Sequence, residues 1–126
     1  MNGPLNDARQ TLVSARALFN LGDKLGAVNR AYYAMFYAAR AALDSVNPNL
    51  PTVKTHSQTI RNFGLHVVLP GHLASEHGRA INLVETLRIS TDYDGAGVTS
   101  QEADAAIKSA ELFVAAVDTF LASRTP

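Results

Sequence analysis

The sequence predicts an all-α fold, an antiparallel up-and-down bundle of four long helices plus one short helix. Apolar residues recur at spacings of three and four through most of the 126 residues, which is the period of a helix. No segment shows the alternation of β-branched residues that is typical of a strand. Prolines and glycines gather in short segments between the periodic stretches. At this length, residues 1–126 are expected to form one domain.

The first helix is expected between residues 5 and 22. Asn6 or Asp7 can cap its start, because a side-chain oxygen can accept a hydrogen bond from a free N–H of the first turn. Gly22 can end it, because glycine readily adopts a left-handed conformation. Its apolar face consists of residues three or four apart: Leu5, Ala8, Leu12, Ala15 and Phe19.

The second helix is expected to be longer, from Asp23 to Asp44, before Pro48 and Pro51 break it. It is apolar nearly all round, which is typical of a buried helix. A stripe of alanines lets another helix approach closely. The stripe comprises Ala27, Ala31, Ala34, Ala38 and Ala41, and the opposite side carries Tyr32, Phe36 and Leu43.

Three further helices are expected in the second half of the chain. A short helix from Thr55 to Phe63 should end at Gly64, and Pro70 and Gly71 mark the next turn. The fourth helix should end near Arg88, with a loop from Asp92 to Gly97. Its apolar face comprises Leu73, His77, Ala80, Val84 and Leu87.

The last helix begins with a capping box, in which the side chains of Thr99 and Glu102 each bond the other's backbone N–H. Its apolar face comprises Ala103, Ile107, Ala110, Val114, Val117 and Leu121.

Charge is distributed unevenly along the chain, although eleven basic and eleven acidic residues cancel. Residues 1–88 carry nine basic and five acidic side chains, whereas residues 89–126 carry two and six. The last helix can therefore pair with the rest of the chain. Alternatively, the segment between Asp44 and Glu76, which has no acidic residue, forms a local anion-binding face. The overall balance argues against attraction of the whole surface to nucleic acid or membrane.

Several classes of function are disfavoured. The chain has no cysteine, which excludes a disulfide framework, a thiolate zinc site and a cysteine nucleophile. It has no glycine-rich phosphate loop. His72 and Glu76 are too few ligands for a metal site. Because these motifs are missing, we expect a protein that uses no metal or cofactor. No signal peptide or membrane span is evident, so we also expect a cytoplasmic protein that binds no membrane.

Arg30, Tyr33 and Tyr37 are spaced so that they align on one face of the second helix. One interpretation is core packing, in which each buried hydroxyl has a partner. The other is a polar strip along a cleft, where Arg30 binds a phosphate and Tyr33 lies beside it.

Lys54 and His56 lie at the start of the short helix. Thr55 or Ser57 can cap that helix. Alternatively, its free N–H groups bind an anion together with the charge of Lys54 and the donors of His56.

Arg88, Asp92 and Tyr93 lie at the end of the fourth helix. Arg88 and Asp92 can pair across one helical turn. Alternatively, the guanidinium lies near the phenol and the carboxylate at the mouth of a cleft, where it stabilises a phosphate.

These pieces together resemble the HEPN domain family (higher eukaryotes and prokaryotes nucleotide-binding), in particular its small stand-alone prokaryotic branch. They occur in the family's order over nearly the full length. They are RAYYAMFYAAR at Arg30–Arg40, KTHS at Lys54–Ser57 followed by Phe63, the R-x-x-x-D-Y of Arg88, Asp92 and Tyr93, and AELF at Ala110–Phe113.

The resemblance implies a homodimer and, in many members, a metal-independent endoribonuclease with an Arg-x(4–6)-His motif. Here Arg88 is followed by Asp92 and Tyr93 where the family has histidine. An aspartate of ordinary pKa cannot serve as an acid near neutral pH. Cleavage would therefore need an imidazole from elsewhere, either His56 or the Arg61–His66 pair.

The resemblance also implies a nucleotidyltransferase partner in a toxin–antitoxin module. In related members this partner adenylylates a tyrosine, and Tyr93 is the corresponding candidate. Two functions follow. The chain is a toxin-type protein that binds RNA or a nucleotide, or it is a non-catalytic module that recruits a substrate or a partner.

Overall fold

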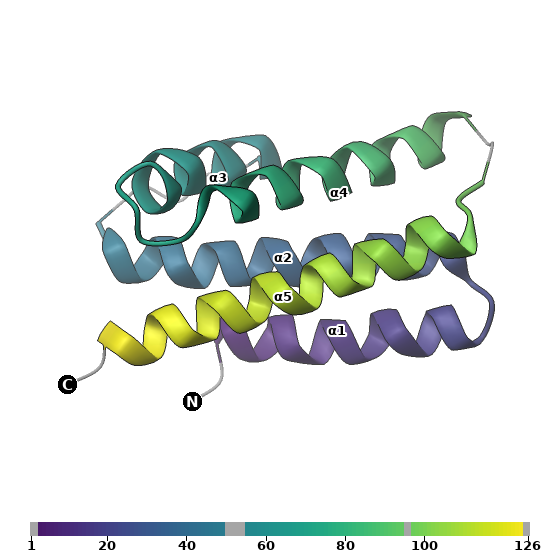
Figure 1. The fold of residues 1–126 in the computed structure, drawn as a ribbon, viewed down its shortest axis with the longest axis horizontal. Coiled ribbons are helices and arrows are strands. Elements are labelled where there is room, and N and C mark those ends of the chain that lie inside the picture. Colours follow the sequence, from purple (N-terminus) through teal and green to yellow (C-terminus); the bar gives the residue numbers. More distant parts are fainter. Residues whose placement is uncertain (1–2, 50–54, 95–96, 125–126) are drawn as a thin grey trace.

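The computed structural model describes residues 3–49, 55–94 and 97–124, with side chains described in the same ranges except 91–94. These residues form helices and no strand, which confirms the predicted fold class. The elements are α1 (Pro4–Asn20), α2 (Lys24–Val46), α3 (His56–Phe63), η1 (Gly64–Val68), α4 (Ser75–Asp94) and α5 (Ser100–Arg124). The four long helices alternate in direction, and α3 with η1 lies over one end of α2 (Figure 1).

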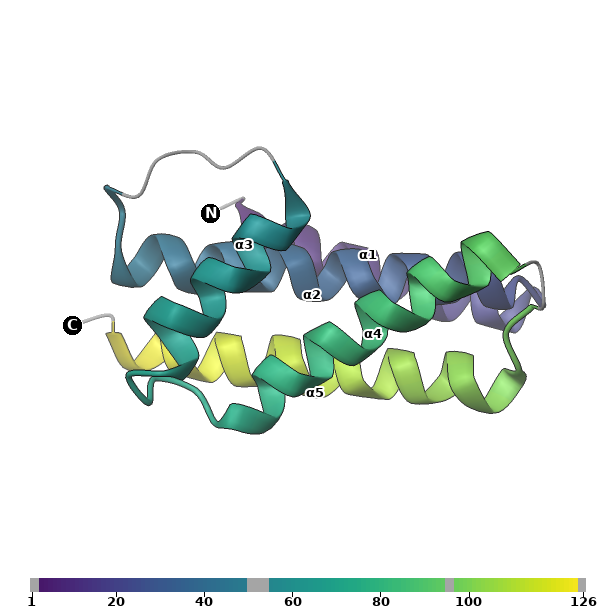
Figure 2. The same cartoon turned by 90° about the horizontal axis from the view of Figure 1, so that it is seen from above.

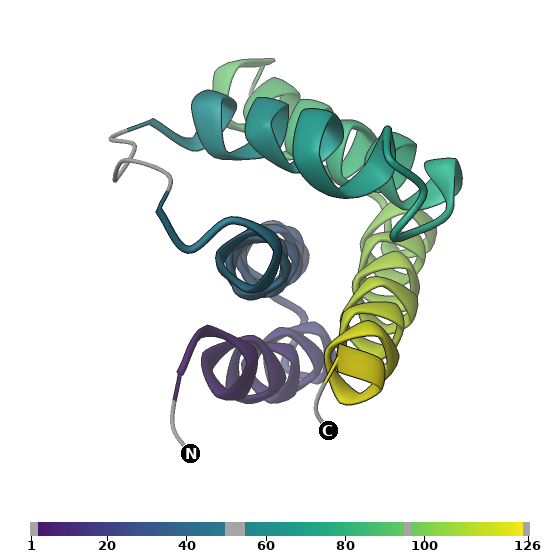
Figure 3. The ribbon, with the colours of Figure 1, turned by 90° about the vertical axis from the view of Figure 1, so that its left-hand side faces the viewer.

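Helix α2 occupies the middle of the bundle. Seen end-on, α1, α5 and the layer of α3 and α4 lie around it (Figure 3), and it contacts every other helix. The predicted alanine stripe is buried except at its end, where Ala41 is half-buried. Ala31, Ala34 and Ala38 are fully inaccessible to solvent. Because these side chains add no bulk, the neighbouring helices can lie close to α2.

Three predicted helix ends are confirmed. Gly22 has a φ of 89° and ends α1, with the N–H of Asp23 donating to Leu18 O at 2.9 Å. The hydroxyl of Thr55 accepts from Gln58 N and caps α3. Thr99 and Glu102 form the capping box of α5, with bonds of 2.9 and 3.0 Å.

The predicted start of the first helix was wrong. Neither Asn6 nor Asp7 is the cap, because α1 already begins at Pro4 with Gly3 at the cap position. Proline suits the first position of a helix for two reasons. Its fixed φ is helical, and the N–H that proline lacks would have no partner within the helix at this position. Asp7 instead lies in the first turn, where a negative charge is favourable.

The short helix ends at Phe63 with Gly64 as its cap residue, as predicted, but Gly64 does not end the helical course of the chain. Gly64 has helical angles, φ −59° and ψ −45°, and the chain continues as the π-helical turn η1. The N–H of Leu69 donates to Gly64 O at 2.8 Å. The chain then turns at Gly71, whose φ is 92°.

Helix α4 does not end near Arg88. It continues to Asp94, so Asp92 and Tyr93 lie in its last turns and not in the predicted loop. The sequence has no proline or glycine between Gly78 and Gly95 to stop a helix.

The uneven charge is matched between α1 and α5. Arg9 pairs with Asp118 at 2.8 Å, and Arg16 pairs with Asp104 at 3.0 Å and Glu111 at 3.6 Å. This confirms pairing of the last helix with the rest of the chain. Because the pairs are partly or largely exposed, each adds little stability.

Candidate functional site

Three helices converge where the sequence places its candidate residues. Seen from above, α3 and α4 diverge from the η1 end and lie across α2 (Figure 2). Side chains from all three helices contact one another in this wedge. We call this group the Arg88 cluster. It comprises Arg30, Tyr32, Tyr33 and Phe36 of α2, His56 of α3, and Glu85 and Arg88 of α4.

The half-buried Arg88 lies against aromatic rings of α2. Its Cζ atom is 4.5 Å from the ring centre of Tyr32 and 6.0 Å from that of Tyr33. A guanidinium over a ring face is attracted by the electrons of that face. The planar group can also bind a phosphate through two parallel N–H donors. The structure thus holds a cation suited to phosphate between the helices.

Tyr32 and Glu85 form the second contact between α2 and α4. The hydroxyl of Tyr32 donates to Glu85 Oε2 at 3.2 Å. Burial of the ring raises the pKa of Tyr32 well above its ordinary value, the negative charge and hydrogen bond of Glu85 raise it further, and Arg88 acts in the opposite direction. The phenol therefore remains a neutral donor at physiological pH.

His56 adds an imidazole to the same cluster. Its ring centre lies 4.3 Å from that of Phe36 and 5.3 Å from that of Tyr33. The cap at Thr55 fixes the start of α3 directly before it. The side chain is half-buried, so one part packs on α2 and another part reaches solvent.

Arg30 supplies a second guanidinium. Its Cζ atom is 4.8 Å from the ring centre of Tyr33, the ring that also lies near Arg88. Tyr37 follows one turn later, 6.1 Å from Tyr33. All three side chains are half-buried. The cluster therefore has two cations beside a shared phenol, which is an arrangement suited to an anion.

The structure does not place the other predicted site residues in the Arg88 cluster. Lys54 lies outside the described residues, and so do the side chains of Asp92 and Tyr93, whose backbone is helical. Arg61 is exposed on α3 and His66 is half-buried in η1, and the imidazole that packs in the cluster is that of His56.

Glu85 and Tyr32 were missed as site residues by the sequence analysis. The spacing of Glu85 and Arg88, three apart on one helix with opposite charge, was an available signal. Its partner Tyr32 is 53 residues away in the chain, so only the packing of α2 against α4 reveals the pair.

The described residues contain neither a metal-binding cluster nor a membrane-spanning helix. No group of three or more histidine, aspartate or glutamate side chains there could hold a metal ion. No described helix is both long and apolar enough to cross a membrane.

The fold and the cluster define a helical-bundle protein with guanidinium, phenol and imidazole groups gathered between three helices. The sequence pattern of the HEPN domain matches residues 3–120. The chain therefore belongs to the HEPN domain family.

Three relatives are similar over most of the chain. "Putative toxin MJ0605" of Methanocaldococcus jannaschii is 38% identical over 107 residues, which cover 85% of this chain and 78% of that protein. "UPF0332 protein glr0978" of Gloeobacter violaceus is 39% identical over 107 residues, covering 85% and 82%. "Putative toxin MJ0142" of M. jannaschii is 27% identical over 123 residues, covering 95% and 80%.

Proposed function

We propose that this chain is a toxin-type HEPN protein that binds RNA or a nucleotide through the Arg88 cluster. The observation that carries the proposal is the convergence of Arg88, His56 and Arg30 from three different helices on the same aromatic rings. Family membership and the names of two relatives support the toxin type.

In this proposal a phosphate lies at the guanidinium of Arg88, with Arg30 and the Tyr33 hydroxyl beside it. Two cations near one phosphate offset its charge in a site from which water is partly excluded. In the sequence, Lys54 adds a further positive charge two residues before α3. Glu85 holds Tyr32, so that the ring under Arg88 stays in place.

If the bound RNA is cleaved, the ribose 2′-hydroxyl attacks the adjacent phosphorus and the bond to the 5′-oxygen breaks. His56 accepts the proton of the 2′-hydroxyl, and the imidazolium that forms donates this proton to the 5′-oxygen as it leaves. Arg88 stabilises the additional negative charge on phosphorus oxygens. In this scheme Tyr93 orients the phosphate, and Asp92 does not act as the acid.

The proposal includes two partners. A second copy of the chain forms a homodimer, for which the exposed Leu83 and Ile89 of α4 offer apolar contact area. A nucleotidyltransferase acts as the antitoxin, with Tyr93 as the residue that it modifies. Light scattering of the purified chain tests the first of these, and a monomer at all concentrations would contradict it.

A non-catalytic function is the second candidate. Asp92 and Tyr93 stand where the family's ribonucleases have histidine, which favours a module that recruits a substrate or partner without cleaving RNA. Cleavage assays distinguish this candidate from a ribonuclease, whereas both can bind RNA.

To test the proposal, purified protein is incubated with mixed RNA, and both the binding and the cleavage of the RNA are measured. Arg88→Ala should lower RNA affinity by about tenfold or more, as for loss of a charged contact of about 1.4 kcal/mol. Arg40→Ala is the matched control, because Arg40 is an exposed arginine on α2. Equal binding by wild type and Arg88→Ala would contradict the proposal.

A further inference from the structure

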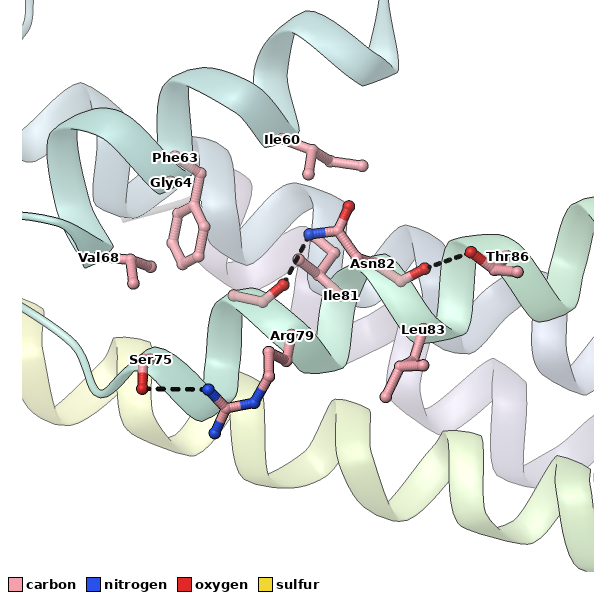
Figure 4. A pocket seen from close by; sticks show the side chains of 11 residues that line it. Ile60, Phe63, Gly64, Val68, Ser75, Arg79, Ile81, Asn82, Leu83 and Thr86 are labelled. Atoms are coloured by element: carbon pink, nitrogen blue, oxygen red, sulfur yellow. Dashed lines mark hydrogen bonds between the residues drawn. The ribbon is translucent and has the colours of Figure 1, made fainter.

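A groove lies between α3–η1 and α4 (Figure 4). It adjoins the Arg88 cluster through Glu85, which lines its smaller part. Its larger part is a cavity of about 510 Å³, within the range of about 300–1,000 Å³ that is usual for small-molecule sites. Ile60, Phe63 and Ile81 line this part with apolar side chains that are at most 7% exposed. A smaller hollow of about 330 Å³ continues the groove to Glu85. The groove can thus receive a flat apolar group.

The groove is continuous with the proposed phosphate site. Its two parts share Gly64 and Asn82 among their lining residues. Glu85 lines the smaller part and also accepts a hydrogen bond from the hydroxyl of Tyr32. Arg88 lies over the ring of this tyrosine. A ligand whose phosphate is at Arg88 can therefore extend along α4 into the groove.

The walls of the groove carry positive charge. Arg61 lies on the α3 side and Arg79 on the α4 side. The guanidinium of Arg79 donates to Ser75 Oγ at 3.3 Å, within the same wall. Glu85 is the one carboxylate among the described lining residues. Apolar surface between two guanidiniums suits an anionic ligand with an apolar ring, such as a nucleotide.

Asn82 offers hydrogen bonds at the centre of the groove. Its Nδ2 donates to Gly78 O at 2.8 Å, which fixes the amide over the groove (Figure 4). An asparagine amide has two N–H donors and an acceptor oxygen. The oxygen and the second N–H are the pair with which asparagine contacts the edge of adenine.

We propose that this groove is the nucleobase subsite of the Arg88 site. An unpaired base next to the bound phosphate enters between α3 and α4, with one face toward Ile60 of α3, the other toward Ile81 of α4, and its edge at Asn82. Single-stranded RNA fits, because its bases can be turned out of a stack. The inference rests on the proposed function and adds to it the place where base identity is read.

Gly64→Leu tests the subsite. Gly64 has helical backbone angles, and a Cβ built there meets no heavy atom within 4 Å, so a side chain is accommodated and occupies the groove. Ala115→Leu adds bulk at an exposed position of α5 and is the matched control. Thermal unfolding monitored by circular dichroism establishes that both variants fold.

The measurement is the fluorescence anisotropy of a labelled single-stranded RNA and of an abasic oligomer of equal length. Wild type should bind the RNA more tightly than the abasic oligomer. Gly64→Leu should bind the RNA about tenfold more weakly than wild type, a loss of about 1.4 kcal/mol. Its affinity for the abasic oligomer should equal that of wild type. Ala115→Leu should match wild type. Arg88→Ala should weaken binding of both oligomers.

The outcomes separate the inference from the proposed function. If Arg88→Ala weakens RNA binding and Gly64→Leu does not, the subsite is wrong and the phosphate site stands. If Arg88→Ala binds RNA as tightly as wild type, both the phosphate site and the subsite are wrong. Loss of association with a nucleotidyltransferase in Gly64→Leu, with unchanged RNA binding, would make the groove a protein-docking site and overturn the inference.

Asn82→Ala is a second variant that leaves the groove open. It should reduce the differences in affinity among homopolymers of adenine, cytosine, guanine and uracil, and leave binding of the abasic oligomer unchanged. Unchanged differences among the four homopolymers would remove Asn82 from its role in reading the base.

Discussion

The guanidinium of Arg88 on α4 lies 4.5 Å from the ring centre of Tyr32 on α2, and the hydroxyl of the same ring donates to Glu85, three residues before Arg88. One phenol thus makes two contacts with the same region of α4. A cation over an aromatic ring contributes about 0.5–2 kcal/mol, depending on its exposure. The pair therefore joins two helices and sets the position of the cation.

Tyr32 should ionise only above the usual range of a tyrosine side chain. Burial and the charge of Glu85 hold its pKa well above the usual value of about 10. A near-ultraviolet absorbance titration should show no Tyr32 signal in the range where exposed phenols ionise, so wild type and Tyr32→Phe should give equal amplitudes there. A larger amplitude for wild type in that range would contradict the burial of the hydroxyl.

Tyr32 should also affect stability at alkaline pH. A raised folded-state pKa means that its contribution is fully present below the unfolded pKa of about 10 and is lost as the pH rises through the folded value. The free energy of unfolding should therefore fall more steeply with alkali in wild type than in Tyr32→Phe. Urea unfolding at several alkaline pH values measures the difference, and parallel curves would refute the linkage.

His56 should have separable structural and chemical roles. His56→Phe keeps a ring against Phe36 and Tyr33, whereas His56→Ala removes it. Alanine should cost about 1–2 kcal/mol of stability, since an aromatic pair contributes about 0.5–1.5 kcal/mol, and phenylalanine should cost less. If the chain cleaves RNA, both variants should lose cleavage. Full cleavage by His56→Phe would exclude the imidazole as proton acceptor.

Asp104 should make the fold sensitive to acid. Hydrogen bonds from Lys108 and Arg16 hold the pKa of Asp104 below its ordinary value. Its contribution is present above the unfolded pKa of about 3.9 and is lost as the pH falls through the folded value. Below about pH 4, wild type should lose more stability than Asp104→Asn, measured by thermal unfolding. Asp44→Asn, at an exposed aspartate of α2, is the control and should behave as wild type.

The alanine stripe should not accept larger side chains. Ala34 is fully buried in α2, and Ala34→Leu must displace its neighbours, at a cost of about 1–3 kcal/mol. Ala115→Leu, on the exposed face of α5, should change stability by less than about 0.5 kcal/mol. Chemical denaturation gives both values. Equal stability of the two variants would show that the helices are not in close contact along the stripe.

The sequence predicts the helices well because their apolar periods are long and their caps are specific, as at Gly22, Thr55 and Thr99. Its errors are at ends judged from composition alone. Gly3 and not Asn6 or Asp7 is the cap of α1. Asp92 lies in a helix that meets no proline or glycine before Gly95.

The site is predicted only in part for a related reason. Arg30, His56 and Arg88 could be nominated because each lies in a local motif. The contact of Tyr32 with Glu85 depends on how α2 packs against α4, and no local pattern encodes it. The groove beside Gly64 is likewise formed by two separate helices, so spacing along one of them could not reveal it.

The most direct test of the phosphate site is an NMR titration of the full chain with adenosine monophosphate. The side-chain Nε–H signal of Arg88 and the ring signals of His56 should shift together and saturate at one common affinity. The signals of Arg40 and His72 should stay in place. Saturating shifts at Arg40 or His72, with Arg88 and His56 unmoved, would contradict the claim that these three helices form an anion site.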